Sequence, residues 1–176
     1  LDEPTEGQLE VMNELTVLSQ RLVTMSHKGA GFLEDIYDAP PEKITFIPHG
    51  VEQLPLVEPE LYKGQFDMEG REVVLTFGLL SPGKGIEYMI EALPPVVEKF
   101  PNLCYIVLGA THPEIKERDG ESYRLGLQRR ARDLGLQKNV LFIDRFVEQE
   151  ELCEFLKAAD VYVTPYLSRK QITSGT

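Results

Sequence analysis

Residues 73–90 read Val-Val-Leu-Thr-Phe-Gly-Leu-Leu-Ser-Pro-Gly-Lys-Gly-Ile-Glu-Tyr-Met-Ile, and the fold prediction starts from this stretch. It opens with an apolar run of the kind that is buried on both faces of a parallel sheet. A glycine ends the run, a short turn follows, and apolar residues then return with helical spacing. The stretch predicts a strand over 72–77, a loop over 78–83 and a helix over 84–100, which Pro94 and Pro95 should interrupt.

The same alternation of strand and helix continues along the chain. Further strands are expected at 103–108, 140–143 and 161–163, further helices at 121–134 and 149–158, and a polar segment at 111–120. Strands that alternate with helices imply βαβ units and therefore an α/β fold with a doubly wound parallel sheet. Ligands of such sheets bind beyond the carboxyl ends of the strands. A site is therefore expected in the loops after Phe77, Leu108, Ile143 and Val163.

The residues before this region form a separate, smaller pattern. We expect a helix over 8–19, a strand over 22–25, a second helix capped by Ser26 and a strand over 43–47. The stretch 51–70 has no sustained periodicity and is expected to be a linker. The chain lacks an initiating methionine and stops at Ser174-Gly175-Thr176, so we interpret it as a fragment with three parts, 1–50, 51–70 and 71–176.

Composition excludes several classes of function. The 176 residues carry a net charge of −11, which argues against a nucleic-acid partner, since that needs clustered Lys and Arg. No stretch approaches the about 20 apolar residues of a membrane span, and no signal peptide is recognisable, so a cytoplasmic location is expected. Cys104 and Cys153 are expected to be reduced thiols. The histidines share no zinc-like spacing, and no metal site is expected.

The loop after the first strand of this region has the chemistry of a phosphate site. Small residues, Gly78, Gly83 and Gly85, would let an anion approach the backbone at the start of a helix, and Lys84 adds a full positive charge. The loop is no Walker A motif, because a glycine follows the lysine, and its glycines lack the spacing of a dinucleotide fingerprint. From the spacing alone, a solvated lysine at an ordinary turn is an equal alternative.

Five stretches together resemble one enzyme family. Gly-Leu-Leu-Ser-Pro-Gly-Lys-Gly-Ile-Glu at 78–87 is similar to the first loop and helix of the donor domain in retaining glycosyltransferases of GT-B architecture, family 4 in particular. The stretch at 43–51 resembles the family hinge, which usually has Asn where His49 stands. The strands at 106–109 and 140–142, and 159–165 before the sugar-recognition loop, resemble the family in the same order.

The resemblance spans about 15–165 and implies an architecture. The two domains of such enzymes are Rossmann-like, with the active site in the cleft between them. Residues 1–50 would close the acceptor-side domain and contain the hinge, and 71–176 would be most of the domain that binds a nucleotide sugar. By this resemblance the donor-binding residues are Gly78, Ser81, Gly83, Lys84, Gly85, Gln171, Thr173 and Ser174. Lys84 matches the family lysine that contacts the diphosphate, and Asp144 and Arg145 would lie on the side of the nucleotide base.

Departures from the family pattern bear on donor binding. Leu79 stands where the family often has a second phosphate-binding arginine. Gln171 falls near the position of the first of two family glutamates, so a carboxylate's charge is lost there. The segment that holds Thr173 and Ser174 could open a helix whose amides face the diphosphate. An ion pair between Asp144 and Arg145 is the plainer interpretation of that pair.

The function implied is transfer of a hexosyl group from a nucleotide-diphosphate sugar to a hydroxyl acceptor, with retention. The acceptor would be a saccharide or a lipid-linked glycan, with no cofactor beyond the donor, and the missing domain leaves room for peripheral membrane association. The fragment alone would be inactive. Alternatives are another GT-B enzyme, such as a nucleotide-sugar epimerase or a phosphorylase, and a non-catalytic phosphoacceptor regulatory module. The last would need paired acidic residues after the first strand, where the sequence has Ser81 and Lys84.

Overall fold

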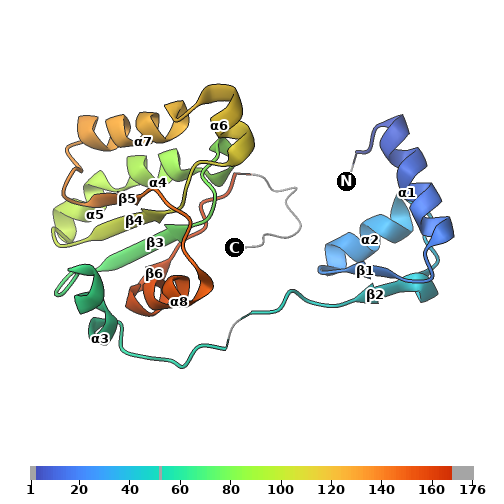
Figure 1. Cartoon of the computed structure of the whole chain (residues 1–176), viewed down its shortest axis with the longest axis horizontal. Helices are drawn as coiled ribbons and strands as arrows, with labels where there is room; N and C mark the ends of the chain where they lie inside the picture. Colours follow the sequence, from blue (N-terminus) through green and yellow to red (C-terminus); the bar gives the residue numbers. More distant parts are fainter. Residues whose placement is uncertain (1–2, 52, 168–176) are drawn as a thin grey trace. The chain divides into compact units, whose positions relative to one another are not determined.

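The computed structural model describes residues 3–51 and 53–167, and the chain divides into two compact units. The first unit runs to Gln53 and the second from Leu54 to Leu167. The division falls inside the stretch that the sequence predicts to be a linker. Each unit is an α/β structure with its own parallel sheet (Figure 1).

The sheet of the second unit has four strands in the order β5-β4-β3-β6, all parallel. These strands are β3 (Val73–Phe77), β4 (Cys104–Leu108), β5 (Val140–Ile143) and β6 (Val161–Tyr162). The chain moves outward from β3 to β5 and then returns to place β6 on the other side of β3. This confirms the doubly wound sheet and puts the reversal of strand order between β3 and β6.

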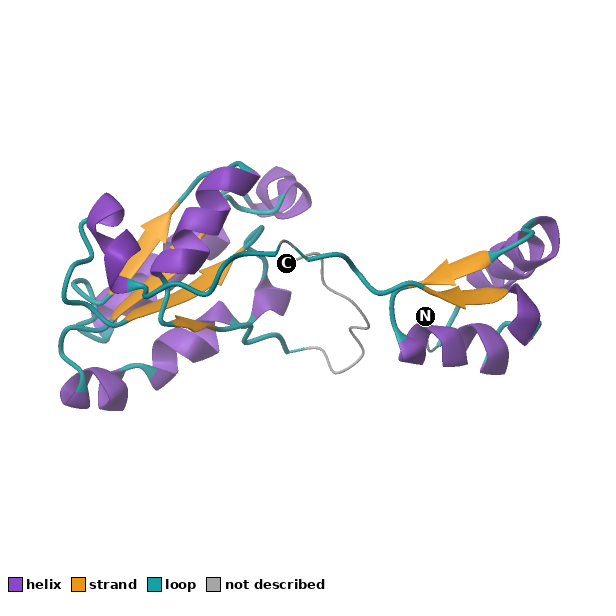
Figure 2. Ribbon diagram, turned by 90° about the horizontal axis from the view of Figure 1, so that it is seen from below, coloured by secondary structure: helices purple, strands orange, loops and turns teal. Residues whose placement is uncertain are grey.

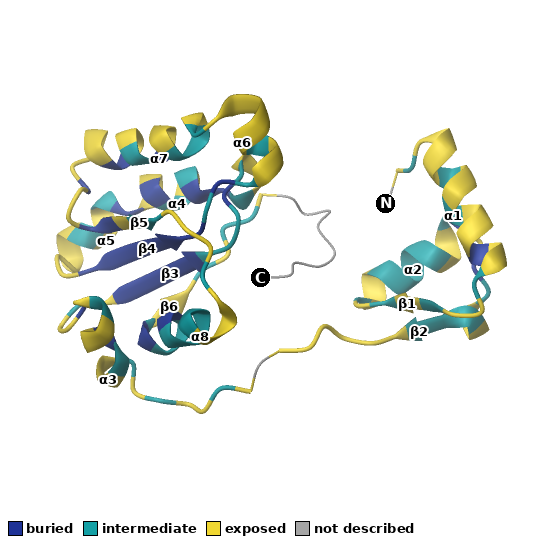
Figure 3. Ribbon diagram, viewed as in Figure 1, coloured by how far each residue is buried: buried dark blue, intermediate teal, exposed yellow. Residues whose placement is uncertain are grey.

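Helices cover both faces of this sheet (Figure 2). On one face lie α4 (Ile86–Ala92), α5 (Pro94–Lys99) and α7 (Ser122–Asp133), and on the other lie α3 (Glu60–Lys63) and α8 (Gln149–Ala158). Alternate residues of β4 serve the two cores, with Tyr105 and Val107 toward α4 and α7, and Cys104 and Ile106 toward α8. All five residues of β4 are buried, as the uninterrupted apolar run predicts (Figure 3).

Three sequence expectations need correction. The helix expected over 84–100 starts only at Ile86, whereas its expected interruption is confirmed, because Pro94 takes the first position of α5. The polar segment over 111–120 contains α6 (Pro113–Asp119), which carries too few apolar residues for a helical stripe to be visible. The stretch over 51–70 contains α3 and the 3-10 helix η2 (Gly64–Phe66).

The structured end of that stretch belongs to the second unit and packs against its core. Phe66 stacks on Phe155 of α8 with 4.0 Å between ring centroids, and Met68 is buried in the same core. The Lys63 side chain is 6% exposed, and its ammonium donates to the Arg71 carbonyl and to Asp160. The contacts with Phe155 and Asp160 join elements distant in sequence, so local periodicity does not reveal them.

The first unit is a single βαβ turn with one further helix. It contains α1 (Glu6–Leu18), β1 (Leu22–Thr24), α2 (His27–Asp35), the 3-10 helix η1 (Pro41–Lys43) and β2 (Ile44–Phe46). The predicted cap of α2 is confirmed, since the Ser26 hydroxyl accepts from the Gly29 amide at 2.9 Å. Large apolar side chains of this unit remain exposed, among them Val11, Val17, Leu18 and Val23.

Cys104 and Cys153 are both free thiols, Cys104 in β4 and Cys153 in α8. Burial raises the pKa of the Cys104 thiol. Within residues 3–51 and 53–167, no helix combines the length and hydrophobicity that a bilayer crossing requires.

Candidate functional site

The candidate site lies in the second unit, where the loops after β3 and β6 meet. β3 and β6 are neighbours in the sheet, paired in parallel through Val74 with Val161 and Leu75 with Tyr162. Because both strands point the same way, the loops that follow them leave from the same edge of the sheet. This edge, at the reversal of strand order, is where doubly wound sheets bind their ligands.

Glycine lets the loop after β3 run close beside the loop after β4. Gly78 and Gly109 both have positive φ, 116° and 143°. A Cβ atom on Gly109 would lie 2.1 Å from the Gly78 carbonyl oxygen, so a side chain cannot fit there. Leu80 then continues the pairing, donating its amide to the Ala110 carbonyl at 2.9 Å. The two loops therefore form a rigid extension of the sheet.

The segment that the sequence singled out follows as a tight 3-10 turn, η3 (Pro82–Lys84). The amide of Lys84 donates to the Ser81 carbonyl at 3.0 Å, and that of Gly85 to the Pro82 carbonyl at 3.3 Å. These two amides therefore form hydrogen bonds within the turn. The expected helix start at Lys84 implied instead that they would be the first amides of α4. Gly85, with φ 66°, instead forms the N-cap of α4.

Gly85 also sets the distance between the loop after β3 and the loop after β6. A Cβ atom there would lie 2.1 Å from the Pro165 carbonyl oxygen. The Leu167 amide reaches the Gly83 carbonyl at 3.4 Å, which adds a weak backbone contact between the same loops. Gly83 itself is exposed, and an added Cβ would meet nothing within 4 Å. The two glycines thus have different roles: Gly85 allows close packing of the two loops, and Gly83 leaves open space beside the backbone.

Lys84 reaches across to the loop after β6. Its ammonium donates to the Tyr166 hydroxyl at 2.7 Å and lies 4.4 Å from the centre of that ring. The structure therefore brings Gly78, Ser81, Gly83, Lys84 and Gly85 together at one edge of the sheet. Tyr166 is a residue that sequence reasoning missed; its position just after the strand at 161–163 was the available signal. Gln171, Thr173 and Ser174 lie outside the described residues.

Asp144 and Arg145 follow β5 but bond to different partners. Arg124 of α7 lies 3.0 Å from Asp144, whereas Arg145 forms a two-point ion pair with Glu151 in the first turn of α8. That pair raises the pKa of Arg145 and lowers that of Glu151. The expected ion pair between Asp144 and Arg145 is therefore wrong, because each finds a partner on a neighbouring helix.

Asp144 belongs to a polar cluster centred on Glu121, just before α7. Glu121 accepts from the Thr111 hydroxyl at 2.5 Å and pairs with Lys116 and Arg124 at 3.0 and 3.1 Å. The hydrogen bond from Thr111 comes first among the causes that lower the pKa of Glu121 from its ordinary 4.5 to about 2, followed by those from Lys116 and Arg124. The cluster ties the loops after β4 and β5 to α7, and no spacing in the sequence could reveal it.

His112, which follows β4, caps α6 by accepting from the Glu114 amide through Nδ1 at 3.3 Å. In the ranges 3–51 and 53–167, no group of three or more His, Cys, Asp or Glu side chains is placed to hold a metal ion.

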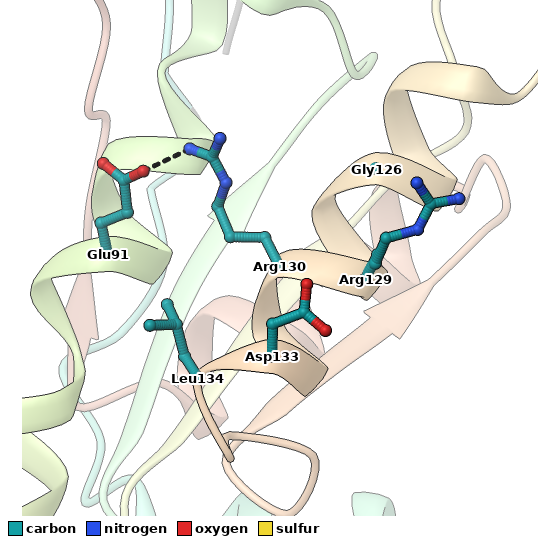
Figure 4. Close-up of a pocket in the computed structure, with 6 residues that line it drawn as sticks. All are labelled: Glu91, Gly126, Arg129, Arg130, Asp133 and Leu134. Atoms are coloured by element: carbon teal, nitrogen blue, oxygen red, sulfur yellow. Dashed lines mark hydrogen bonds and ion pairs between the residues drawn. The ribbon is translucent and has the colours of Figure 1, made fainter.

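A surface hollow of about 340 Å³ lies elsewhere, between α4 and α7. Glu91, Arg129, Arg130 and Asp133 line it, and Glu91 pairs with Arg130 across it (Figure 4). Arg129, Arg130 and Asp133 lie near the end of α7, which leads back to the amino end of β5, and Glu91 lies near the end of α4. The hollow is therefore remote from the strand ends at which the loops after β3 and β6 meet.

Comparison with protein families gives a match over residues 59–170 to the glycosyl transferases group 1. Two mannosyltransferases of Mycolicibacterium smegmatis are similar. One is a GDP-mannose-dependent alpha-(1-6)-phosphatidylinositol monomannoside mannosyltransferase, 31% identical over 105 residues, or 60% of this chain and 25% of the relative. The other, a phosphatidyl-myo-inositol mannosyltransferase, is 28% identical over 122 residues, or 69% and 28%.

Solved structures share the fold. The chain matches Anabaena Alr3699/HepE in complex with UDP with a TM-score of 0.75 at 19% identity, over 94% of this chain and 44% of that one. It matches WaaG, a glycosyltransferase involved in lipopolysaccharide biosynthesis, with a TM-score of 0.64 at 22% identity, over 83% and 38%. The fold is thus Rossmann-like and of the GT-B type. The chain spans about a quarter of the curated relatives, and it belongs to the family of glycosyl transferases group 1.

Proposed function

We propose that this chain supplies the donor-binding part of an enzyme that transfers a hexosyl group from a nucleoside diphosphate sugar to a hydroxyl acceptor, with retention. The observation that carries the proposal is the place of Lys84. Its ammonium lies between the loops that follow β3 and β6, at the reversal of strand order, in a chain whose family transfers sugars.

The chemistry of this edge suits a diphosphate. As the bond between the sugar and the diphosphate breaks, negative charge develops on the leaving diphosphate, and a fixed cation stabilises that charge more in the transition state than in the bound donor. Lys84 supplies that cation, and the open space at Gly83 leaves room for an anion beside the backbone. Ser81, Gly78 and Gly85 would shape the loop, since each takes part in its turn geometry or close packing.

The remaining donor contacts are assigned on the family pattern. Gln171, Thr173 and Ser174 would face the sugar and the diphosphate, and Asp144 the side of the base. Arg145 is a weaker candidate for the base side, since its guanidinium is held by Glu151. Both mannosyltransferase relatives act on phosphatidylinositol-based lipids by their names, which supports a saccharide or lipid-linked glycan as acceptor.

Because the relatives are about four times as long as the matched region, we propose that this chain alone binds donor but transfers no sugar. In such enzymes the protein chiefly orients the two substrates and stabilises the leaving diphosphate. Nothing in this role calls for a cofactor besides the donor. We also propose a cytoplasmic location, with peripheral membrane association through the acceptor-side domain.

The test is calorimetric titration of the chain with UDP, GDP, UDP-glucose and GDP-mannose. Lys84→Met should weaken binding ten- to a hundredfold, since a charge-assisted phosphate contact contributes about 1.5–3 kcal/mol. Lys99→Met, at an exposed lysine in the last turn of α5, is the matched control and should leave binding unchanged. Equal effects of the two substitutions, or no saturable binding at millimolar nucleotide, would count against the proposal.

A further inference from the structure

Tyr166 lies in the loop after β6, and that loop packs against the loop after β3, which contains Lys84. The absence of a side chain at Gly85 lets the Pro165 carbonyl approach, and the Leu167 amide contacts the Gly83 carbonyl. These two contacts flank Tyr166 in the chain. Its backbone is therefore held beside Lys84 from both sides.

The contact between the two side chains is made through the hydroxyl of Tyr166. The Lys84 ammonium is 2.7 Å from that oxygen but 4.4 Å from the ring centre, so it lies at the hydroxyl end of the ring. Tyrosine has few rotatable bonds, whereas a lysine side chain carries some of the largest conformational entropy of any residue. A rigid partner that accepts one hydrogen bond thus restricts a flexible cation.

We propose that Tyr166 is a positioning residue for donor binding. Its hydroxyl holds the Lys84 ammonium at the reversal of strand order between β3 and β6 before the diphosphate binds. An ammonium group has three N–H donors, and a tyrosine hydroxyl accepts through one of them. The Tyr166 bond is therefore compatible with a phosphate contact by the same group. Part of the ordering of Lys84 is complete before the donor binds, which favours binding. This inference rests on the proposed function, since it assigns a second residue to the same site.

The first arm of the test needs no nucleotide. Carbon-13 relaxation at Cε of Lys84, measured by NMR on the whole chain, should show a restricted side chain in the wild type and a more mobile one in Tyr166→Phe. Tyr88→Phe is the matched control, because Tyr88 is an exposed tyrosine on α4 and should leave Lys84 unchanged. Equal mobility of Lys84 in the wild type and in Tyr166→Phe overturns the inference, whatever the protein binds.

The second arm is a double-mutant cycle on the affinity for UDP and GDP. Tyr166→Phe should weaken binding three- to tenfold in the wild type and have no further effect in Lys84→Met. A merely structural tyrosine would give the same loss in both backgrounds, and that result, or tighter binding by Tyr166→Phe, overturns the inference while the proposed function stands. Absence of nucleotide binding in the wild type would overturn both, and the first arm would then still report separately on the Lys84 contact.

Discussion

The Lys63 ammonium lies 3.0 Å from a carboxylate oxygen of Asp160, although 97 positions separate the two residues. That oxygen, Asp160 Oδ2, also accepts from the Val73 amide at 2.6 Å, and Asp160 Oδ1 accepts from the Lys63 ammonium at 3.1 Å. Burial alone would lower the pKa of Lys63, but hydrogen bonds to Asp160 and Glu60 outweigh it and raise that pKa. One carboxylate thus joins α3, the start of β3 and the residue before β6.

Asp160→Ala should therefore destabilise the second unit markedly. The substitution leaves a buried ammonium and the Val73 amide without this acceptor. Breaking a fully buried ion pair costs about 3–5 kcal/mol. We expect a loss of about 2–4 kcal/mol here, because the Asp160 side chain is 35% exposed to solvent. Urea unfolding followed by amide NMR signals of β3 and β4 measures this unit separately. Asp133→Ala, at an exposed position of α7, should change stability by less than about 0.5 kcal/mol.

The low pKa of Glu121 makes the stability of the second unit sensitive to acid. Its pKa is depressed to about 2 from 4.5, so its contribution to stability is fully present above about pH 4.5 and is lost as the pH falls toward 2. A carboxyl carbon-13 titration should give Glu121 a midpoint well below 3. Thr111→Val removes the hydrogen bond that is the largest cause and should raise that midpoint. A midpoint near 4.5 in the wild type would show that the cluster is not formed in solution.

Gly85 and Gly83 form a matched pair for the geometry of the loop. Gly85→Ala places a side chain at φ 66°, which costs about 1–2 kcal/mol, and its Cβ would also collide with the Pro165 carbonyl. Relief of that collision must move the loop that carries Tyr166, so we expect both lower stability and at least tenfold weaker nucleotide binding. Gly83→Ala meets open space and should leave stability within about 0.5 kcal/mol. Similar stabilities for the two variants would contradict this account.

The regular part of the fold was predictable from the sequence because its signals are local. The run Val73-Val74-Leu75 is fully apolar and forms a central strand, and β5 and α8 begin and end where the periodicity predicts. The break between α4 and α5 was predictable because Pro94 has no backbone N–H to continue the helical hydrogen bonds. Lys84 was found because a lysine between two glycines after a strand is unusual enough to be noticed.

The contacts that complete the site could not be predicted, because they join residues far apart in the chain. Tyr166 meets Lys84 across 82 positions, and Arg124 pairs with Asp144 across two elements of structure. An arginine on a polar helix gives no local sign of its partner. Asp144 and Arg145, adjacent in sequence, were expected to pair with each other, whereas in the structure Asp144 pairs with Arg124 of α7 and Arg145 with Glu151 of α8.

A buried hydrogen-bond chain runs from β4 to the end of β6 and gives a last prediction. The Tyr105 hydroxyl donates to Thr76 Oγ1 at 2.9 Å, and Thr76 Oγ1 donates to the Val163 carbonyl at 2.7 Å. Burial raises the pKa of Tyr105 to about 12, so its hydroxyl stays a donor at physiological pH. These hydrogen bonds link the interior of the sheet to the end of β6, which leads to Tyr166.

The two ends of this chain should respond unequally to mutation. Tyr105→Phe removes one donor but leaves the Thr76 bond to Val163, and should cost about 1 kcal/mol. Thr76→Val leaves a buried tyrosine hydroxyl and the Val163 carbonyl without this partner, and should cost about 2–3 kcal/mol. In the double variant the tyrosine hydroxyl is no longer stranded, so we expect a loss smaller than the sum of the two. Urea unfolding of the three variants measures the coupling, and additive losses would show that the hydroxyls do not act as one chain.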